Sequence, residues 1–208
     1  MTPLYHITHI RNLEAIIGAG GLHCDKGIAR NRLQVQGIAH NHIKHRRDRR
    51  AVPACVGGTL SDYVPFYFAP RSPMLFAIHR GNVEGYDGGQ EGVLHLVSNA
   101  EAVDRAADLQ FCFTEGHAEM GFSEFFEDLH DLSKVDWRVM KALYWRDTEE
   151  DLDRKRRRQA EFLVHRFFPW PLVTQIAVMN DKVAHEVEKI IAECEHKPTI
   201  VIERQWYY

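Results

Sequence analysis

The sequence has few cysteines, no long hydrophobic run and no dominant charge, and each absence excludes a class of protein. Its four cysteines, at positions 24, 55, 112 and 194, lie far apart and form no CxxC pair. This spacing excludes a zinc knuckle and a disulfide scaffold, and it predicts reduced thiols. No apolar run approaches the roughly 20 residues of a membrane span, and the N-terminus lacks the pattern of a signal peptide. We therefore expect a cytoplasmic protein without a membrane partner.

The signatures of several enzyme classes are also missing. The sequence contains no GxGxxG, GxxxxGK[ST], HExxH or GxSxG motif, which argues against the usual nucleotide-binding, zinc-protease and hydrolase sites. The nearest approach to a metal site is His40, His42 and His45. These histidines overlap KHRRDRR (44–50), whose positive charge opposes a cation. We expect no metal.

What is present fits one globular domain spanning residues 1–208. The chain is 45% hydrophobic and 26% charged, and its net charge of −3 conceals two basic clusters, KHRRDRR and RKRRR (154–158). Such clusters favour a phosphate-binding surface if the fold brings them together, and otherwise form solvated helix faces.

Hydrophobic periodicity predicts short strands mixed irregularly with helices. Strands are expected at 4–9, 64–70, 93–98, 109–113, 160–167, 174–180 and 199–204. Helices are expected at 12–19, after the Ser72-Pro73 cap, at 99–107, around 134–144 and at 181–195, with a long loop or short helices at 22–40. This order indicates an α+β domain with mixed sheets.

Three patches have unusual chemistry, although each also has a plainer interpretation. In YHITH (5–9), strand alternation places His6 and Thr8 on one face and His9 on the other. The two histidines could be functional groups, or they could simply form hydrogen bonds at the end of a strand. The aromatic residues of DYVPFYFAPRSPM (62–74) could stack on a flat ring such as nicotinamide or a base, or they could belong to the hydrophobic core. In AEFLV (160–164), Glu161 lies at the start of an apolar strand. A glutamate there is usually exposed, but if it is buried, its carboxylate needs an ion-pair or hydrogen-bond partner, or it has a function in catalysis.

The sequence resembles the DarT family of bacterial DNA ADP-ribosyltransferase toxins. The matching stretches follow the family order and cover nearly the whole chain: YHITHIRNLEAII, NHIKHRR, DYVPFYFAPRSPML, YWRDT, RRRQAEFLV and the final Tyr207-Tyr208. The resemblance implies an ADP-ribosyltransferase-like fold, with mixed β-sheets around an NAD cleft and peripheral helices. It also implies transfer of ADP-ribose from NAD to a base in single-stranded DNA, and a macrodomain antitoxin as partner. Thymine is favoured over guanine as the target base, and we expect a monomer.

The resemblance also implies functions for individual residues on the NAD side. Glu161 matches the catalytic glutamate, which in this fold hydrogen-bonds the ribose 2′-hydroxyl and stabilises positive charge as nicotinamide leaves. Arg47 matches the catalytic arginine, with Arg46 as the alternative. The expected NAD contacts are His6, Thr8, His9, Asn12, Tyr67, Phe68, Arg71 and Met74. We expect Glu161→Ala to abolish transfer and leave the fold intact.

The segment Leu143 to Gln159, which we call the acceptor loop, is implied to present the DNA. Its aromatic pair is expected to stack on bases and its five consecutive cations to contact phosphates. The expected DNA contacts are Arg46, His117, Tyr144, Trp145, Arg146, Arg154 and Arg157. Loss of Arg156, Arg157 and Arg158 is expected to flatten the salt dependence of binding.

Three other functions remain open at this stage. A protein mono-ADP-ribosyltransferase would label protein instead of DNA. A relative of RNA 2′-phosphotransferases would use arginines and histidines without the glutamate. A non-catalytic nucleic-acid-binding module would bind DNA without NAD and without chemistry.

Overall fold

The main feature of the fold is an eight-stranded mixed sheet that divides into two halves. The computed structural model describes residues 1–208 except for the side chain of Asn41. The strands are β1 (Pro3–His9), β3 (Tyr63–Tyr67), β4 (Val93–Asn99), β5 (Phe111–His117), β6 (Phe125–Phe126), β7 (Ala160–His165), β9 (Gln175–Val178) and β10 (Thr199–Ile202). Their order is β10-β9-β4-β1-β3-β7-β5-β6, with β9 and β10 parallel.

The two halves meet at a single residue pair. β1 pairs with β4 along its whole length, but within the described chain it pairs with β3 only at Tyr5 and Tyr67. Beyond this pair the two strands diverge, and the backbone leaves space between them that side chains line. The four strands from β10 to β1 and the four from β3 to β6 therefore behave as two joined sheets.

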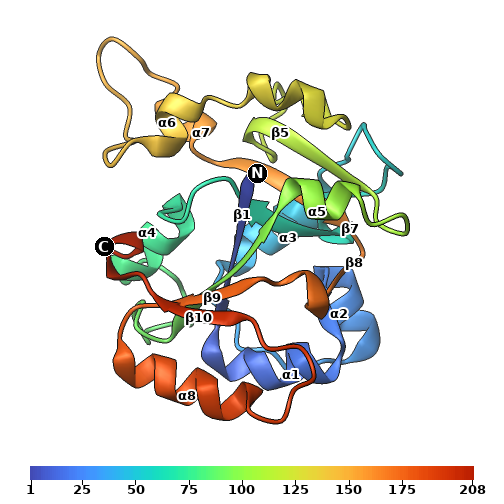
Figure 1. Cartoon of the computed structure of the whole chain (residues 1–208). Coiled ribbons are helices and arrows are strands. Elements are labelled where there is room, and N and C mark those ends of the chain that lie inside the picture. Colours follow the sequence, from blue (N-terminus) through green and yellow to red (C-terminus); the bar gives the residue numbers. More distant parts are fainter.

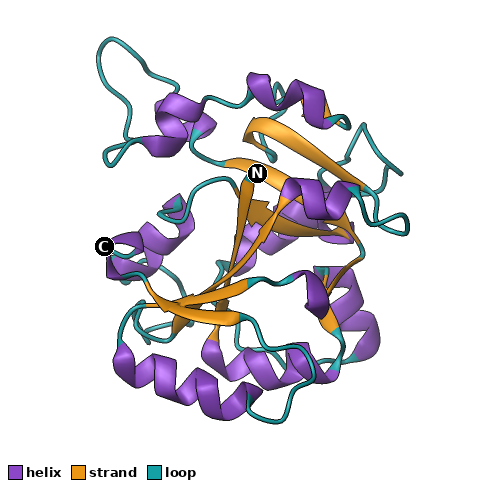
Figure 2. Cartoon of the chain, viewed as in Figure 1, coloured by secondary structure: helices purple, strands orange, loops and turns teal.

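Helices surround the sheet on its outer sides (Figure 2). They are α1 (Leu13–Gly18), α2 (Asp25–Asn31), α3 (Asn41–Arg49), α4 (Pro73–His79), α5 (Ala100–Asp104), α6 (Trp137–Lys141), α7 (Arg154–Arg157) and α8 (Asp181–Ile191). In Figure 1, α8 lies below β9 and β10, whereas α6 and α7 lie at the other end of the molecule. A two-stranded sheet of β2 (Gly21–His23) and β8 (Phe167–Pro169) completes the fold.

Local sequence signals explain several element boundaries. The Ser72 side chain accepts the Leu75 N–H at 3.1 Å, and Pro73 occupies the first turn of α4, where its missing N–H costs nothing. Asn180 caps α8 in the same way through the Val183 N–H at 3.0 Å. These caps confirm the expected helix starts.

The expected α+β class, with mixed sheets and peripheral helices, is confirmed, and the differences are local. The strand expected at 160–167 ends at His165, because Arg166 has a φ of 63° and turns the chain into β8. The strand expected at 109–113 runs from Phe111 to His117, and the helix expected at 134–144 is reduced to α6. Within the described residues, no helix is long and apolar enough to cross a membrane.

Buried His95 in β4 makes stability depend on pH. Its ring nitrogens lie 3.3 Å from the Tyr207 hydroxyl and 3.0 Å from the Pro70 carbonyl oxygen, and burial lowers the pKa of His95 to about 4. The unfolded chain, with a histidine pKa of about 6.5, then binds the proton more readily, so stability is full above that pH and is lost as the pH falls. We expect His95 to account for about 2 kcal/mol of the loss between pH 7 and pH 5.

Urea unfolding of the wild-type protein and of His95→Gln at these two pH values tests this expectation. The variant should be less stable at pH 7 and should lose less stability on acidification. Equal losses in the two proteins would show that His95 does not titrate on unfolding.

Candidate active site

A cleft of about 390 Å³ opens where β1 and β3 diverge, and most of the residues predicted on the NAD side line it. Strands β1, β3 and β7 form one wall, and α2, α3 and the chain between them form another. The predicted residues that it brings together are His6, Thr8, Asn12, Arg47, Tyr67, Met74, His117 and Glu161. Segments spread between His6 and Glu161 thus converge on one site.

The centre of the cleft is a buried ion pair between Arg47 and Glu161. Arg47 Nη1 lies 2.8 Å from Glu161 Oε2, and the two residues are 8% and 4% exposed. Burial disfavours the guanidinium charge, but the carboxylate outweighs it and raises the pKa of Arg47. Arg47 Nη2 is buried and has no hydrogen-bond partner among the described residues. Because such a donor is costly to leave unpaired, it is suited to bind a ligand.

The choice between Arg47 and Arg46 as the partner of Glu161 is resolved by geometry. Helix α3 directs Arg47 into the cleft, whereas Arg46 turns outward, with a side chain that is 57% exposed. Arg46 Nε instead donates to Glu119 Oε2 at 2.7 Å.

Strand pairing fixes the position of the glutamate. In the β3–β7 register Glu161 lies opposite Tyr67, and its N–H donates to Thr114 Oγ1 of β5 at 3.1 Å. Desolvation, with the neighbouring Glu161 charge, raises the pKa of Tyr67, so its phenol stays protonated and acts as a donor. The backbone of Glu161 is therefore held by β3 and β5, and its carboxylate by Arg47 of α3.

Two histidines border the ion pair. His117 Nδ1 is 3.8 Å from Glu161 Oε1 and 3.4 Å from the backbone nitrogen of Glu119. His6 Nδ1 donates to the Pro65 carbonyl oxygen at 2.8 Å, and burial lowers the pKa of His6. His6 is therefore neutral at pH 7, and its Nε2 is an acceptor.

Asn12 and Thr8 join the two walls of the cleft near Gln36. Asn12 Nδ2 donates to Thr8 Oγ1 at 3.1 Å and to the Gln36 carbonyl oxygen at 3.0 Å, and Asn12 Oδ1 accepts the Gln36 N–H at 2.6 Å. These bonds fix the segment around Gln36 against β1. The amide of Asn12 is thus used to position the wall of the cleft.

Three predicted NAD contacts do not line the cleft, and their contact with NAD stays a prediction. His9 is on the other face of β1, where it caps the next turn through the Arg11 N–H at 3.2 Å. Phe68 is buried core, edge-on to Trp137 with ring centroids 5.6 Å apart. The Arg71 guanidinium stacks on the Tyr208 ring, 4.2 Å from its centroid.

The two aromatic residues of the acceptor loop, Tyr144 and Trp145, have different environments. Tyr144 is 76% exposed, and its stacking on a base stays a prediction. Trp145 is buried, and its Nε1 donates to the Tyr208 hydroxyl at 2.9 Å, which in turn donates to the Arg71 carbonyl oxygen at 3.2 Å. The prediction that Trp145 stacks on a base is therefore wrong, because this side chain fastens the loop to the C-terminal residue.

The basic run at 154–158 is not a free cationic surface. Arg156 pairs with Glu115 and Asp153, and Arg157 pairs with Asp136 and Asp151.

Arg158 is 3% exposed and donates to four carbonyl groups, those of Arg71, Val139, Met140 and Ala142. The expectation that Arg156, Arg157 and Arg158 contact phosphates is therefore wrong. Their guanidiniums are used to fold the acceptor loop. Contacts of Arg46, Arg146 and Arg154 with DNA stay predictions.

Sequence reasoning missed several residues that line the cleft. Gln159 lies just before β7 begins and lines the cleft together with Glu161, and Lys155 reaches the cleft from the basic run. Lys44 joins them from α3. Among the described residues, no group of three or more histidine, cysteine, aspartate or glutamate side chains is arranged to hold a metal ion.

Comparison with known proteins gives the family. A family model described as ssDNA thymidine ADP-ribosyltransferase, DarT, matches residues 5–208. A DNA ADP-ribosyl transferase of Thermus sp. (strain 2.9) is 46% identical over 211 residues, covering 100% of this chain and 96% of the relative. A DNA ADP-ribosyl transferase-DNA ADP-ribosyl glycohydrolase fusion protein of Thermosipho africanus is 27% identical, over 90% of this chain and 45% of the fusion.

Solved structures agree in fold. Thermus sp. 2.9 DarT in complex with ADP-ribosylated ssDNA matches with a TM-score of 0.93 and 45% identity, covering 100% of this chain and 96% of that one. The same protein in complex with NAD+ matches with a TM-score of 0.89 and 43% identity, covering 100% and 98%. The fold is thus that of an ADP-ribosyltransferase. Within that class, the chain belongs to the DarT family.

Proposed function

We propose that this protein transfers ADP-ribose from NAD to a base in single-stranded DNA. The buried Arg47–Glu161 pair, with Arg47 Nη2 left without a partner in the cleft, is the observation that carries the proposal. The Thermus relative of the same fold has been solved with NAD+ and with ADP-ribosylated ssDNA. An RNA 2′-phosphotransferase, which works without the glutamate, would not need this pair.

The cleft supplies groups for each part of the reaction. Glu161 accepts a hydrogen bond from the ribose 2′-hydroxyl and stabilises positive charge as the glycosidic C–N bond breaks and nicotinamide leaves with the electron pair. Arg47 Nη2 donates to the pyrophosphate or to the acceptor base. A ring nitrogen of the base then forms the new C–N bond and loses its proton to Glu161 or to His117, which lies 3.8 Å from Glu161.

Thymine is the proposed target, with guanine as the alternative, and the name of the matching family supports thymine. We further propose a bacterial toxin that acts in the cytoplasm as a single-domain monomer. A macrodomain antitoxin that removes the mark is the proposed partner, since the Thermosipho relative joins a transferase and a glycohydrolase in one fusion protein.

Oligonucleotides that each contain one thymine or one guanine in an otherwise constant strand test the target. After incubation with NAD, intact-mass analysis should show a gain of one ADP-ribose on the thymine strand alone. A gain on the guanine strand alone would overturn thymine as target and keep the reaction class. Labelling of added protein in place of DNA would favour protein mono-ADP-ribosylation.

A further inference from the structure

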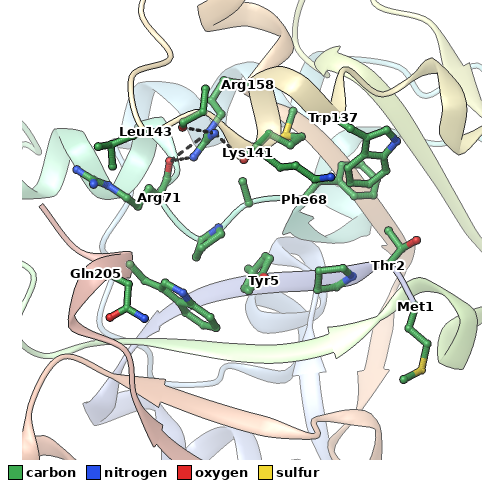
Figure 3. Close-up of a pocket in the computed structure, with 16 residues that line it drawn as sticks. Met1, Thr2, Tyr5, Phe68, Arg71, Trp137, Lys141, Leu143, Arg158 and Gln205 are labelled. Atoms are coloured by element: carbon green, nitrogen blue, oxygen red, sulfur yellow. Dashed lines mark hydrogen bonds between the residues drawn. The ribbon is translucent and has the colours of Figure 1, made fainter.

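A second cavity of about 560 Å³, which we call the aromatic pocket, lies apart from the cleft. It is bordered by the start of β1, the chain after β3, helix α6 and the chain near the C-terminus (Figure 3). Its lining includes the aromatic residues Tyr5, Phe68, Trp137 and Trp206, and the cationic residues Arg71, Lys141 and Arg158. Its volume is within the range of sites for small ligands.

The aromatic pocket and the cleft are neighbouring cavities at the β1–β3 junction. Tyr5 lines the pocket and the next residue, His6, lines the cleft, and Phe68 and Tyr67 are divided in the same way. The two cavities share no lining residue. The pocket is therefore separate from the proposed NAD site.

The lining of the aromatic pocket suits an aromatic anion. No aspartate or glutamate is among its lining residues, whereas three cations are. Among the described residues, Arg71 Nε is buried without a hydrogen-bond partner, and Lys141 is an exposed member of the lining. Aromatic rings give a base sequence-tolerant stacking faces, and the cations attract a phosphate. A nucleotide combines both groups in one ligand.

The acceptor loop borders both cavities. Ala142 and Leu143, where the loop begins, line the aromatic pocket, and Lys155 and Gln159, near its end, line the cleft. Tyr144, 76% exposed, follows directly after the pocket residues. A DNA strand that leaves the cleft and crosses the acceptor loop would therefore pass Tyr144 and then reach the aromatic pocket.

We propose that the aromatic pocket binds one nucleotide of the DNA strand outside the target base, an inference that rests on the proposed function. Its base lies among Tyr5, Trp137 and Trp206, and its phosphate lies near Arg71 and Lys141. The pocket extends the grip on the strand beyond the reacting nucleotide and takes no part in the chemistry.

Binding of labelled oligonucleotides without NAD tests this proposal. A trimer centred on the target base fills the cleft alone, whereas a ten-nucleotide strand reaches the pocket. We expect Lys141→Glu to weaken binding of the longer strand about tenfold and to leave trimer binding within about twofold. Lys134→Glu, the same charge change at an exposed lysine outside the pocket lining, is the control and should have little effect on either.

Two further experiments show where the nucleotide binds and whether it belongs to the DNA strand or is a free nucleotide. A photoreactive thymine analogue placed in the ten-nucleotide strand, outside the three central nucleotides, should cross-link to Tyr5, Trp137 or Trp206. A free mononucleotide, followed by quenching of tryptophan fluorescence, shows whether the pocket instead takes an unlinked nucleotide. Quenching that Lys141→Glu removes, with unchanged strand binding, assigns the pocket to the free nucleotide and overturns the DNA strand as its source.

The proposal is overturned if Lys141→Glu and Lys134→Glu act alike on the trimer, the longer strand and the mononucleotide. A failure of the wild-type protein to bind any strand would count against the proposed function as well. In that case, the mononucleotide arm still decides whether the pocket is a nucleotide site.

Discussion

Replacing Glu161 with glutamine is expected to reduce ADP-ribosyl transfer about 10²–10³-fold while the protein still folds. Glutamine keeps the shape of the side chain and an oxygen that accepts the Arg47 N–H, now 2.8 Å away in the ion pair. It removes the negative charge that stabilises the oxocarbenium-like carbon, and a single electrostatic contact of this kind is worth about 10²–10³ in rate. Single-turnover transfer to an oligonucleotide measures the effect.

Glu161→Ala is a poorer test, because the structure contradicts the expectation that this change leaves the fold intact. Arg47 is 8% exposed, and alanine would leave its charge buried without a partner, at a cost of about 3–5 kcal/mol. Thermal unfolding of both variants separates the two effects. Transfer by a folded Glu161→Gln variant at the wild-type rate would contradict the assigned function of the carboxylate.

The second large effect is expected at Arg158, on stability. Arg158→Met replaces a buried guanidinium that donates to the carbonyl groups of Arg71, Val139, Met140 and Ala142. Several carbonyl groups lose their partner, each at a cost of about 1 kcal/mol or more, so the unfolding free energy should fall by about 3–5 kcal/mol. At about 2–4 °C per kcal/mol, the melting temperature should fall by about 10 °C.

Lys155→Met is the matched control for Arg158→Met. It lies in the same basic run and loses the same charge, but its side chain is exposed. Its effect on the unfolding free energy should stay within about 0.5 kcal/mol. Equal melting temperatures for the two variants would show that Arg158 does not hold the acceptor loop in place.

The sequence predicts the features of this protein that depend on local pattern. The apolar run after Glu161, the Ser72 cap and the alternation of His6 and Thr8 each correspond to an element or a face that the structure contains. The family resemblance supplied Arg47 and Glu161 as catalytic residues, and the structure shows that they pair although 114 residues separate them in the chain. No local sequence pattern predicts a contact between residues so far apart in the chain.

Prediction from sequence fails where long-range contacts decide what a side chain does. Arg157 and Trp145 look like ligands for a nucleic acid, but Asp136 pairs with the first and Tyr208 accepts a hydrogen bond from the second. The partners lie 21 and 63 residues away, so the pattern of the loop itself cannot reveal them. His9 and Phe68 were assigned to the cleft by family position, although strand alternation places each on the opposite face from its neighbour in the cleft.

Intact-mass analysis of nucleic acids incubated with the protein and NAD tests the central claim most directly. Single-stranded DNA, a duplex and an RNA of the same sequence are compared, with Glu161→Gln as the inactive control. The structure and the family predict that single-stranded DNA alone gains the mass of one ADP-ribose, and that the variant transfers none. Hydrolysis of NAD with no mass gain on any nucleic acid would contradict the claim, because the cleft would then be active and the acceptor would not be DNA.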